Sequence, residues 1–160
     1  NWIKVNALID AATKTVLSWK FSGPHEHDTK FLPGLVKAVR APIRELYADA
    51  GYLSNANCWA ARAAGAKPYI RPKKNTRQAP PKPLGPDTRT AFHRMVGEEQ
   101  TNPTQWYQHY GRRNGIEATF GAIKRRFGGR IRATNPLMRL TEAALKLLTW
   151  NLTRIRYGEF

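Results

Sequence analysis

The sequence contains little of what several classes of protein require. It has a single cysteine, Cys58, among 160 residues. This excludes a disulfide scaffold and a cysteine-rich zinc module, and it fits a reducing compartment. No apolar run approaches the roughly 18 residues that a membrane-spanning helix needs. Acidic residues are also scarce, with 11 Asp and Glu against 27 Lys and Arg, which gives a net charge of +16.

The excess of positive charge indicates the kind of partner to expect. Because it causes self-repulsion in a compact state, we expect an anionic partner that neutralises it. Nucleic acid is favoured over an acidic membrane surface, since no basic amphipathic helix stands out. Hydrophobic residues make up 41% and aromatic residues 11% of the chain, enough for a core. The length indicates one domain, with room for a small appendage.

Strand and helix patterns alternate along the chain. Alternating hydrophobicity predicts strands over residues 3–9, 15–21, 43–49 and 66–71. Helical patterns cover residues 28–39, 54–64, 87–99, 104–127 and 137–156. In the last helix the expected apolar face consists of Leu137, Leu140, Ala144, Leu147, Leu148, Leu152 and Ile155. Residues 72–86 hold five prolines and four Lys or Arg, so we expect a basic loop or insertion within a single domain spanning 1–160. The alternation favours an α/β sheet over a helical bundle.

Four reactive side chains recur at helical spacing within the segment 104–127. Tyr110, Arg113, Glu117 and Lys124 are separated by two, three and six residues. At about 100° per residue they fall within roughly 60° of one another on one helix. Glu117 would lie at the border of the buried face, between two cations that keep its carboxylate ionised, as a metal ligand requires. The alternative is a solvated face with an Arg113–Glu117 pair contributing about 0.3–0.5 kcal/mol. We favour the functional interpretation for two reasons. The tyrosine and the lysine lie at helical spacing from the Arg113–Glu117 pair, and the chain as a whole is strongly basic.

The tetrad resembles the signature of the cut-and-paste insertion-sequence transposases, which are DDE enzymes with a ribonuclease H-like core. The resemblance extends over nearly the whole chain. Residues 3–19 are similar to the second and third strands of that family, and residues 27–28 to its His-Asp pair. Residues 47–52 resemble the strand that presents the second catalytic Asp. Residues 124–128 resemble the basic end of the helix with the catalytic Glu, and residues 148–154 the closing helix.

The resemblance implies a fold and an activity. The fold would be α/β, a ribonuclease H-like mixed sheet flanked by helices. The activity would be metal-dependent phosphoryl transfer, comprising strand cleavage and strand transfer at transposon ends. Three carboxylates would hold two Mg²⁺ ions, with Mn²⁺ able to substitute, to activate a water or a DNA 3′-hydroxyl and to stabilise the leaving oxygen. Asp49 and Glu117 are the implied catalytic residues and metal ligands.

Double-stranded DNA, both transposon ends and target, is the implied partner. The expected DNA-binding residues are Tyr110, Arg113, Lys124, Arg125, Arg126, Lys73 and Lys74. Arg113 and Lys124 would hold phosphates beside the metals, while Tyr110 would bond a phosphate or stack on a displaced base. The others, together with Arg77, Lys82, Arg130 and Arg132, would add contacts to the backbone that do not depend on sequence. The resemblance further implies a homo-oligomeric full-length protein in the prokaryotic cytoplasm, associated with the nucleoid and not with a membrane.

One feature departs from the family pattern. The first catalytic Asp is expected on a strand upstream of residue 1, so we expect this chain to lack that strand and, alone, not to cut DNA. Asp10 is interpreted as a turn former, and Asp28 as a helix cap rather than a ligand. Two alternative functions stay open, a ribonuclease H-like nuclease and a non-catalytic DNA-binding remnant of a transposase.

The remaining candidate side chains receive ordinary structural interpretations. Cys58 and the tryptophans Trp19, Trp59, Trp106 and Trp150 are expected in the core. His93 and His109 are expected at the surface or facing DNA.

Overall fold

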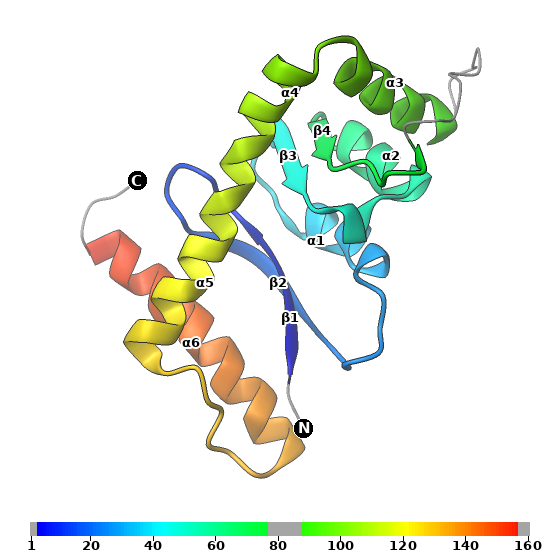
Figure 1. Cartoon of the computed structure of the whole chain (residues 1–160). Helices are drawn as coiled ribbons and strands as arrows, with labels where there is room; N and C mark the ends of the chain where they lie inside the picture. Colours follow the sequence, from blue (N-terminus) through cyan, green and yellow to red (C-terminus); the bar gives the residue numbers. More distant parts are fainter. Residues whose placement is uncertain (1–2, 77–87, 157–160) are drawn as a thin grey trace. The chain divides into compact units, whose positions relative to one another are not determined.

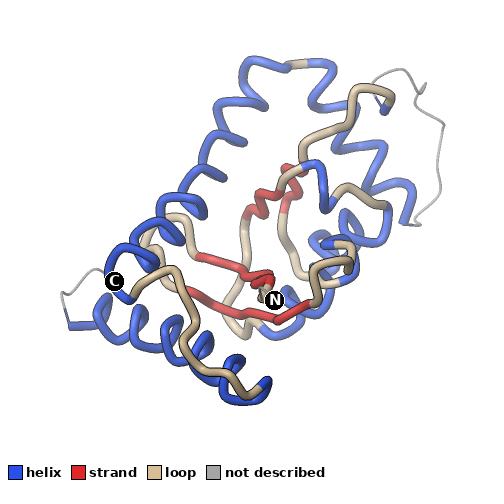
Figure 2. The backbone as a smooth tube through the Cα atoms, turned by 60° about the horizontal axis from the view of Figure 1, so that its bottom comes forward, coloured by secondary structure: helices blue, strands red, loops and turns tan. Residues whose placement is uncertain are grey.

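The computed structural model describes residues 3–76 and 88–156, whose strands and helices are drawn in Figures 1 and 2. The elements in chain order are β1 (Lys4–Ile9), β2 (Val16–Ser22), η1 (Asp28–Lys30), α1 (Leu32–Ala38), β3 (Glu45–Ala48), η2 (Ala50–Tyr52), α2 (Asn55–Ala63), β4 (Lys67–Ile70), α3 (Thr88–Thr101), α4 (Pro103–Tyr110), η4 (Gly111–Arg113), α5 (Asn114–Phe127) and α6 (Pro136–Arg156). The chain divides into two compact units. Unit 1 combines Asn1–Glu26 with Asn114–Phe160, and unit 2 comprises His27–Arg113.

Unit 1 contains an antiparallel hairpin. β1 pairs with β2 in a register that places Ala7 opposite Trp19. Asp10 holds the turn between the strands, because its Oδ1 accepts hydrogen bonds from the N–H groups of Ala12 (3.0 Å) and Thr13 (2.6 Å). The predicted hairpin and the predicted role of Asp10 are therefore confirmed.

Helices α5 and α6 pack against this hairpin. The buried core of unit 1 consists of Val16, Ile123, Leu147 and Trp150. Asn151 of α6 bonds both backbone groups of Val16 on β2. Its Oδ1 accepts from the Val16 N–H at 2.9 Å, and its Nδ2 donates to the Val16 carbonyl at 2.8 Å. The Trp150 Nε1 likewise donates to the Lys14 carbonyl at 2.8 Å. These polar contacts fix which side of α6 meets the hairpin.

The buried side of α6 differs from the predicted one. The structure buries Ala143, Leu147 and Trp150. Five members of the predicted apolar face are instead exposed: Leu137, Leu140, Leu148, Leu152 and Ile155. The prediction of the helix itself is confirmed, and so is the burial of Leu147, but the assignment of the five exposed residues to the buried face is wrong. The contacts of Asn151 and Trp150 with the hairpin select the other stripe.

Unit 2 contains a parallel pair of strands. β3 and β4 pair with Tyr47 opposite Tyr69, and α2 forms the crossover that a parallel connection requires. The side chain of Ser54 caps α2 by accepting from the Asn57 N–H at 3.1 Å. The helix ends in a Schellman turn at Gly65, whose φ of 80° favours glycine. The largest buried side chains in unit 2 include Leu35, Leu46, Ile70 and Met95.

The mixed α/β character predicted for the chain is confirmed. The described strands form two separate sheets of two strands each, one antiparallel and one parallel. The ribonuclease H-like arrangement stays a prediction. Residues 77–86 of the predicted basic loop lie outside the described residues. Within the described segments, no helix combines the length and apolar character needed to span a membrane.

Candidate active site

Asp49 lies at the carboxyl end of β3, directly after Ala48. Because β3 and β4 are parallel, their carboxyl ends meet at one edge of the sheet, and Arg71 follows β4 at that edge. The Arg71 N–H donates to the Ala48 carbonyl at 3.2 Å. Asp49 is half-buried, and its Oδ1 accepts from the Gly51 N–H at 2.9 Å at the start of η2. This bond alone is an ordinary helix cap and does not indicate a functional role for Asp49. Evidence for such a role must come from the residues around Asp49.

A second carboxylate lies near Asp49. A Cβ atom on Gly51 would come within 2.9 Å of Asp49 Oδ1 and 3.7 Å of Asp28 Oδ2, so both carboxylates flank this glycine. Asp28 is the first residue of η1, and His27 precedes this helix without a capping side-chain hydrogen bond. The prediction that Asp28 caps a helix is therefore wrong. Instead, η1 packs against η2 and brings Asp28 to the same edge.

Tyr110, the last residue of α4, is electrostatically coupled to this edge. Burial raises the pKa of its phenol, the cations Arg113 and Arg71 lower it, and the negative charge of Asp49 raises it, with a net increase. The phenol therefore stays protonated at neutral pH and can donate a hydrogen bond. Its ring stacks on Trp106, with centroids 5.3 Å apart and planes inclined by 16°. Trp106 therefore covers one face of the Tyr110 ring.

Tyr52 of η2 lies beside the two carboxylates. Burial raises the pKa of its phenol, and the negative charges of Asp28 and Asp49 raise it further. We name the following set in unit 2 the carboxyl-edge cluster: Asp28, Asp49, Tyr52, Arg71, Tyr110 and Arg113. The sequence predicts Asp49, Tyr110 and Arg113 as functional but misses Arg71. The signal for Arg71 is its place directly after a strand parallel to β3.

The tetrad does not lie on one helix. The structure distributes it over three segments, with Tyr110 at the end of α4, Arg113 in η4, and Glu117 and Lys124 on α5. The prediction of a single helix through all four residues is wrong. Gly111, Asn114 and Gly115 are poor helix formers, and the chain tightens into a 3₁₀ turn among them. The first two residues of the tetrad belong to unit 2 and the last two to unit 1.

Glu117 and Lys124 share α5. They lie seven residues apart, about two helical turns, so both project from the same side of the helix. Both are exposed, Glu117 in the first turn and Lys124 in the last. The prediction that Glu117 borders the buried face is not met, since the buried residues of α5 are Thr119 and Ile123. The positions of the two charges also complement the helix dipole, which stabilises α5 independently of any catalytic role.

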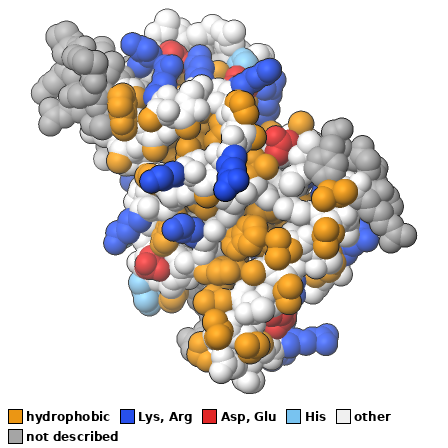
Figure 3. Space-filling model, turned by 180° about the vertical axis from the view of Figure 1, so that it is seen from behind, with side chains coloured by type: hydrophobic (Ala, Val, Ile, Leu, Met, Phe, Trp, Pro, Cys, Tyr) orange, Lys and Arg blue, Asp and Glu red, His pale blue; other side chains and the backbone are white. Residues whose placement is uncertain are grey.

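Most of the basic residues predicted to contact DNA are exposed where the structure describes them, whereas Arg113 is half-buried. Lys124, Arg125 and Arg126 form the last turn of α5, while Lys73 and Lys74 follow β4. Arg77 and Lys82 lie outside the described residues. Figure 3 shows a surface on which Lys and Arg side chains outnumber Asp and Glu side chains. Such dispersed cations suit the phosphates of a nucleic-acid backbone.

The carboxyl-edge cluster contains the type of ligand atom that a divalent cation prefers. Carboxylate oxygens such as those of Asp28 and Asp49 are hard ligands, which Mg²⁺ prefers. In the part of the chain that the structure describes, however, no group of three or more His, Cys, Asp or Glu residues gathers. The two carboxylates of unit 2 therefore form a partial ligand set.

Other candidate side chains have structural roles. Cys58 is fully buried, which confirms its predicted place in the core, and burial raises the pKa of its thiol to about 12, so the thiol is unreactive. The His109 ring stacks on Tyr69 with centroids 5.4 Å apart, and its Nδ1 lies 3.3 Å from Glu45 Oε1. It thus packs on Tyr69 while its side chain stays 34% exposed, and its predicted position facing DNA stays a prediction. Trp59 is 44% exposed, so its assignment to the core is wrong.

Comparison with known families gives a match over most of the chain. A family model described as "Transposase DDE domain" matches residues 1–152. No curated protein and no solved structure matches this chain.

Proposed function

The chain belongs to the transposase DDE domain family, and on this premise we propose that the protein encoded by the complete open reading frame carries out DNA strand cleavage and strand transfer at transposon ends. The observation that supports this most strongly is the position of Asp49 at the carboxyl edge of β3 and β4. Open α/β sheets place their sites at that edge. A second carboxylate beside Asp49 would supply a ligand for a metal, and Arg71 and Arg113, which like Asp49 are electrostatically coupled to Tyr110, would supply contacts for phosphates. These are the two requirements of metal-assisted phosphoryl transfer.

We infer that Asp49 and Glu117 hold Mg²⁺, for which Mn²⁺ can substitute. When bound, the metal supplies an activated oxygen nucleophile and stabilises the leaving oxygen. The hydrogen bond from Gly51 holds the Asp49 carboxylate in one orientation, as a metal ligand requires. Glu117 contributes from the exposed side of α5, which leaves it accessible to a metal and a DNA strand.

The cations and the phenol of the proposed site bind the DNA backbone. Arg71 and Arg113, both coupled to Tyr110, would receive a phosphate beside Asp49. Tyr110 keeps its proton because its pKa is raised, so it donates to a phosphate oxygen. Lys124 would bind a phosphate beside Glu117, since the two share one side of α5. Lys73, Lys74, Arg125 and Arg126 add contacts along the duplex.

The proposal is tested in the protein encoded by the complete open reading frame. Glu117→Gln should abolish Mg²⁺-dependent strand cleavage and leave DNA affinity nearly unchanged, because the amide keeps the shape and loses the charge. Lys124→Ala should weaken binding and reduce the salt slope by about one phosphate contact. Lys37→Ala, on the exposed end of α1, is the charge-matched control.

Three other outcomes would contradict the proposal, in whole or in part. Full cleavage by Glu117→Gln would contradict the catalytic role of this residue. Cleavage without any joining of transposon ends would identify a nuclease. Binding without cleavage in the unaltered protein would identify a DNA-binding remnant.

A further inference from the structure

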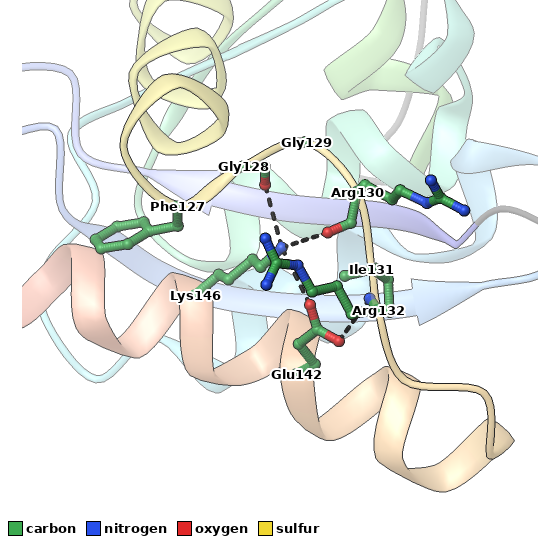
Figure 4. Close-up of a pocket in the computed structure, with 8 residues that line it drawn as sticks. All are labelled: Phe127, Gly128, Gly129, Arg130, Ile131, Arg132, Glu142 and Lys146. Atoms are coloured by element: carbon green, nitrogen blue, oxygen red, sulfur yellow. Dashed lines mark hydrogen bonds and ion pairs between the residues drawn. The ribbon is translucent and has the colours of Figure 1, made fainter.

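The segment between α5 and α6 is tied to α6 by two side chains of that helix. Glu142 Oε2 accepts hydrogen bonds from the N–H groups of Arg132 and Ala133, each at 2.9 Å. Lys146 Nζ donates to the carbonyls of Gly128 (3.1 Å) and Arg130 (2.7 Å). Figure 4 shows the bonds to Gly128, Arg130 and Arg132 on one side of the segment, which we call the clamped loop (residues 128–133).

The two clamping side chains also bond each other. Lys146 Nζ lies 3.2 Å from Glu142 Oε1, and the Lys146 side chain is only 18% exposed. The ammonium group of Lys146 therefore bonds groups of the protein itself, although most cations of this chain face solvent. The hydrogen bonds from Ala133 and Arg132, together with Lys146, also hold the pKa of the Glu142 carboxyl below its usual value. A carboxylate and an ammonium group thus satisfy four backbone groups of the clamped loop.

The clamped loop displays cations next to α5. Arg130 and Arg132 are exposed, and in Figure 4 the Arg130 side chain points away from Lys146. A hollow of about 740 Å³ lies between the loop and α6, with both arginines on its lining. A Cβ atom on Gly129 would lie 3.8 Å from Lys124 Cγ, so the loop packs against the lysine proposed to hold a phosphate. The loop arginines therefore continue the basic last turn of α5.

We propose that the clamped loop is a preorganised binding element for the phosphate backbone of duplex DNA, in which Arg130 and Arg132 contact phosphates and Glu142 and Lys146 are positioning residues. The inference rests on the proposed function, because it requires DNA to approach α5. Fixing the loop before binding reduces the conformational entropy lost when the arginines engage phosphates. Each guanidinium can also present two donors to one phosphate.

The test uses a variant for which the change in net charge and the proposal predict opposite changes in DNA affinity. Glu142→Ala makes the chain more positive, so charge alone would tighten binding to a short labelled DNA duplex of arbitrary sequence. The proposal predicts weaker binding, by up to about 60-fold near 0.1 M salt, and a salt slope shallower by up to about 1.8, for two lost phosphate contacts. Glu98→Ala is the matched control, since Glu98 pairs with Lys67 at 2.8 Å and is 35% exposed. It should bind DNA as tightly as the unaltered chain or more tightly.

A double-mutant cycle separates positioning from a general effect on folding. Replacing Arg130 and Arg132 together by Ala should weaken binding to the same extent, and adding Glu142→Ala should then change affinity little. Lys146→Gln enters the same cycle as a second variant, with circular dichroism to verify that each variant is folded.

Each outcome of these measurements is decisive. Equal or tighter binding by Glu142→Ala, or fully additive losses in the cycle, would overturn the positioning role while leaving the proposed function intact. A complete absence of DNA binding by the unaltered chain would overturn both.

Discussion

The contact between Asn151 and β2 offers the clearest stability test. Asn151 bonds both backbone groups of Val16, whose side chain is 3% exposed and belongs to the core of unit 1. Asn151→Ala removes both bonds and leaves a backbone donor and a backbone acceptor of Val16 without their partners. An alanine cannot replace either interaction, and the neighbouring Trp150 bond reaches a different residue, Lys14.

The expected loss follows from the number of groups left unsatisfied. Each buried polar group that loses its partner costs about 1–3 kcal/mol. Because Asn151 is only half-buried, water can reach part of the gap, so we expect the lower half of the summed range. Asn151→Ala should therefore reduce the free energy of unfolding by about 2–4 kcal/mol.

Urea unfolding followed by circular dichroism measures this change. The control is Thr149→Ala, at an exposed position of the same helix, which should alter stability by no more than about 0.5 kcal/mol. If the two variants unfold at the same urea concentration, the bonds to Val16 do not stabilise unit 1, and the reasoning about α6 is wrong.

Two further predictions concern Gly51 and Asp10. In the protein encoded by the complete open reading frame, Gly51→Ala should reduce strand cleavage by about 100-fold, because the new Cβ would lie 2.9 Å from Asp49 Oδ1 and displace the carboxylate. The control is Gly97→Ala, whose new Cβ would meet no neighbouring atom within 4 Å and which should cleave normally. Equal cleavage rates of the Gly51 and Gly97 variants would refute the argument that Gly51 leaves room for the Asp49 carboxylate. Burial raises the pKa of Asp10, but bonds from Thr13 and Ala12 and the charge of Lys14 outweigh it and give a net lowering. Asp10 therefore contributes stability above the ordinary carboxyl pKa that is lost as pH falls through the lowered value. The free energy of unfolding in urea should accordingly differ between Asp10→Asn and the unaltered chain at neutral pH, and the two values should converge in acid. A difference that stays constant with pH would contradict this.

The sequence predicts local features of the fold more reliably than the choice of a buried face. The hairpin is predictable because alternating residues and the turn chemistry of Asp10 act within a few positions. The buried face of α6 is not, since two apolar stripes run along this helix at similar spacing. Contacts with the distant Val16 and Lys14 select between the stripes, and no local pattern records them.

The same distinction applies to the candidate site. Asp49 is predictable from its motif at the end of a strand, whereas Arg71 enters the cluster only through the parallel pairing of β3 with β4. Helical spacing predicts that Glu117 and Lys124 share a face, and they do. Spacing fails for Tyr110 and Arg113, because a 3₁₀ turn interrupts the helix after Tyr110.

The central claim is that Asp49 and Glu117 hold a metal together, and paramagnetic Mn²⁺ tests it most directly. In nuclear magnetic resonance spectra of the isotope-labelled chain, Mn²⁺ broadens the amide signals of residues near its site. We predict that Gly51 and Ala118 broaden over the same range of Mn²⁺ concentration, and that either Asp49→Asn or Glu117→Gln removes the broadening at both. Broadening at Ala118 that survives Asp49→Asn would show that each carboxylate binds Mn²⁺ separately, which would contradict a shared site.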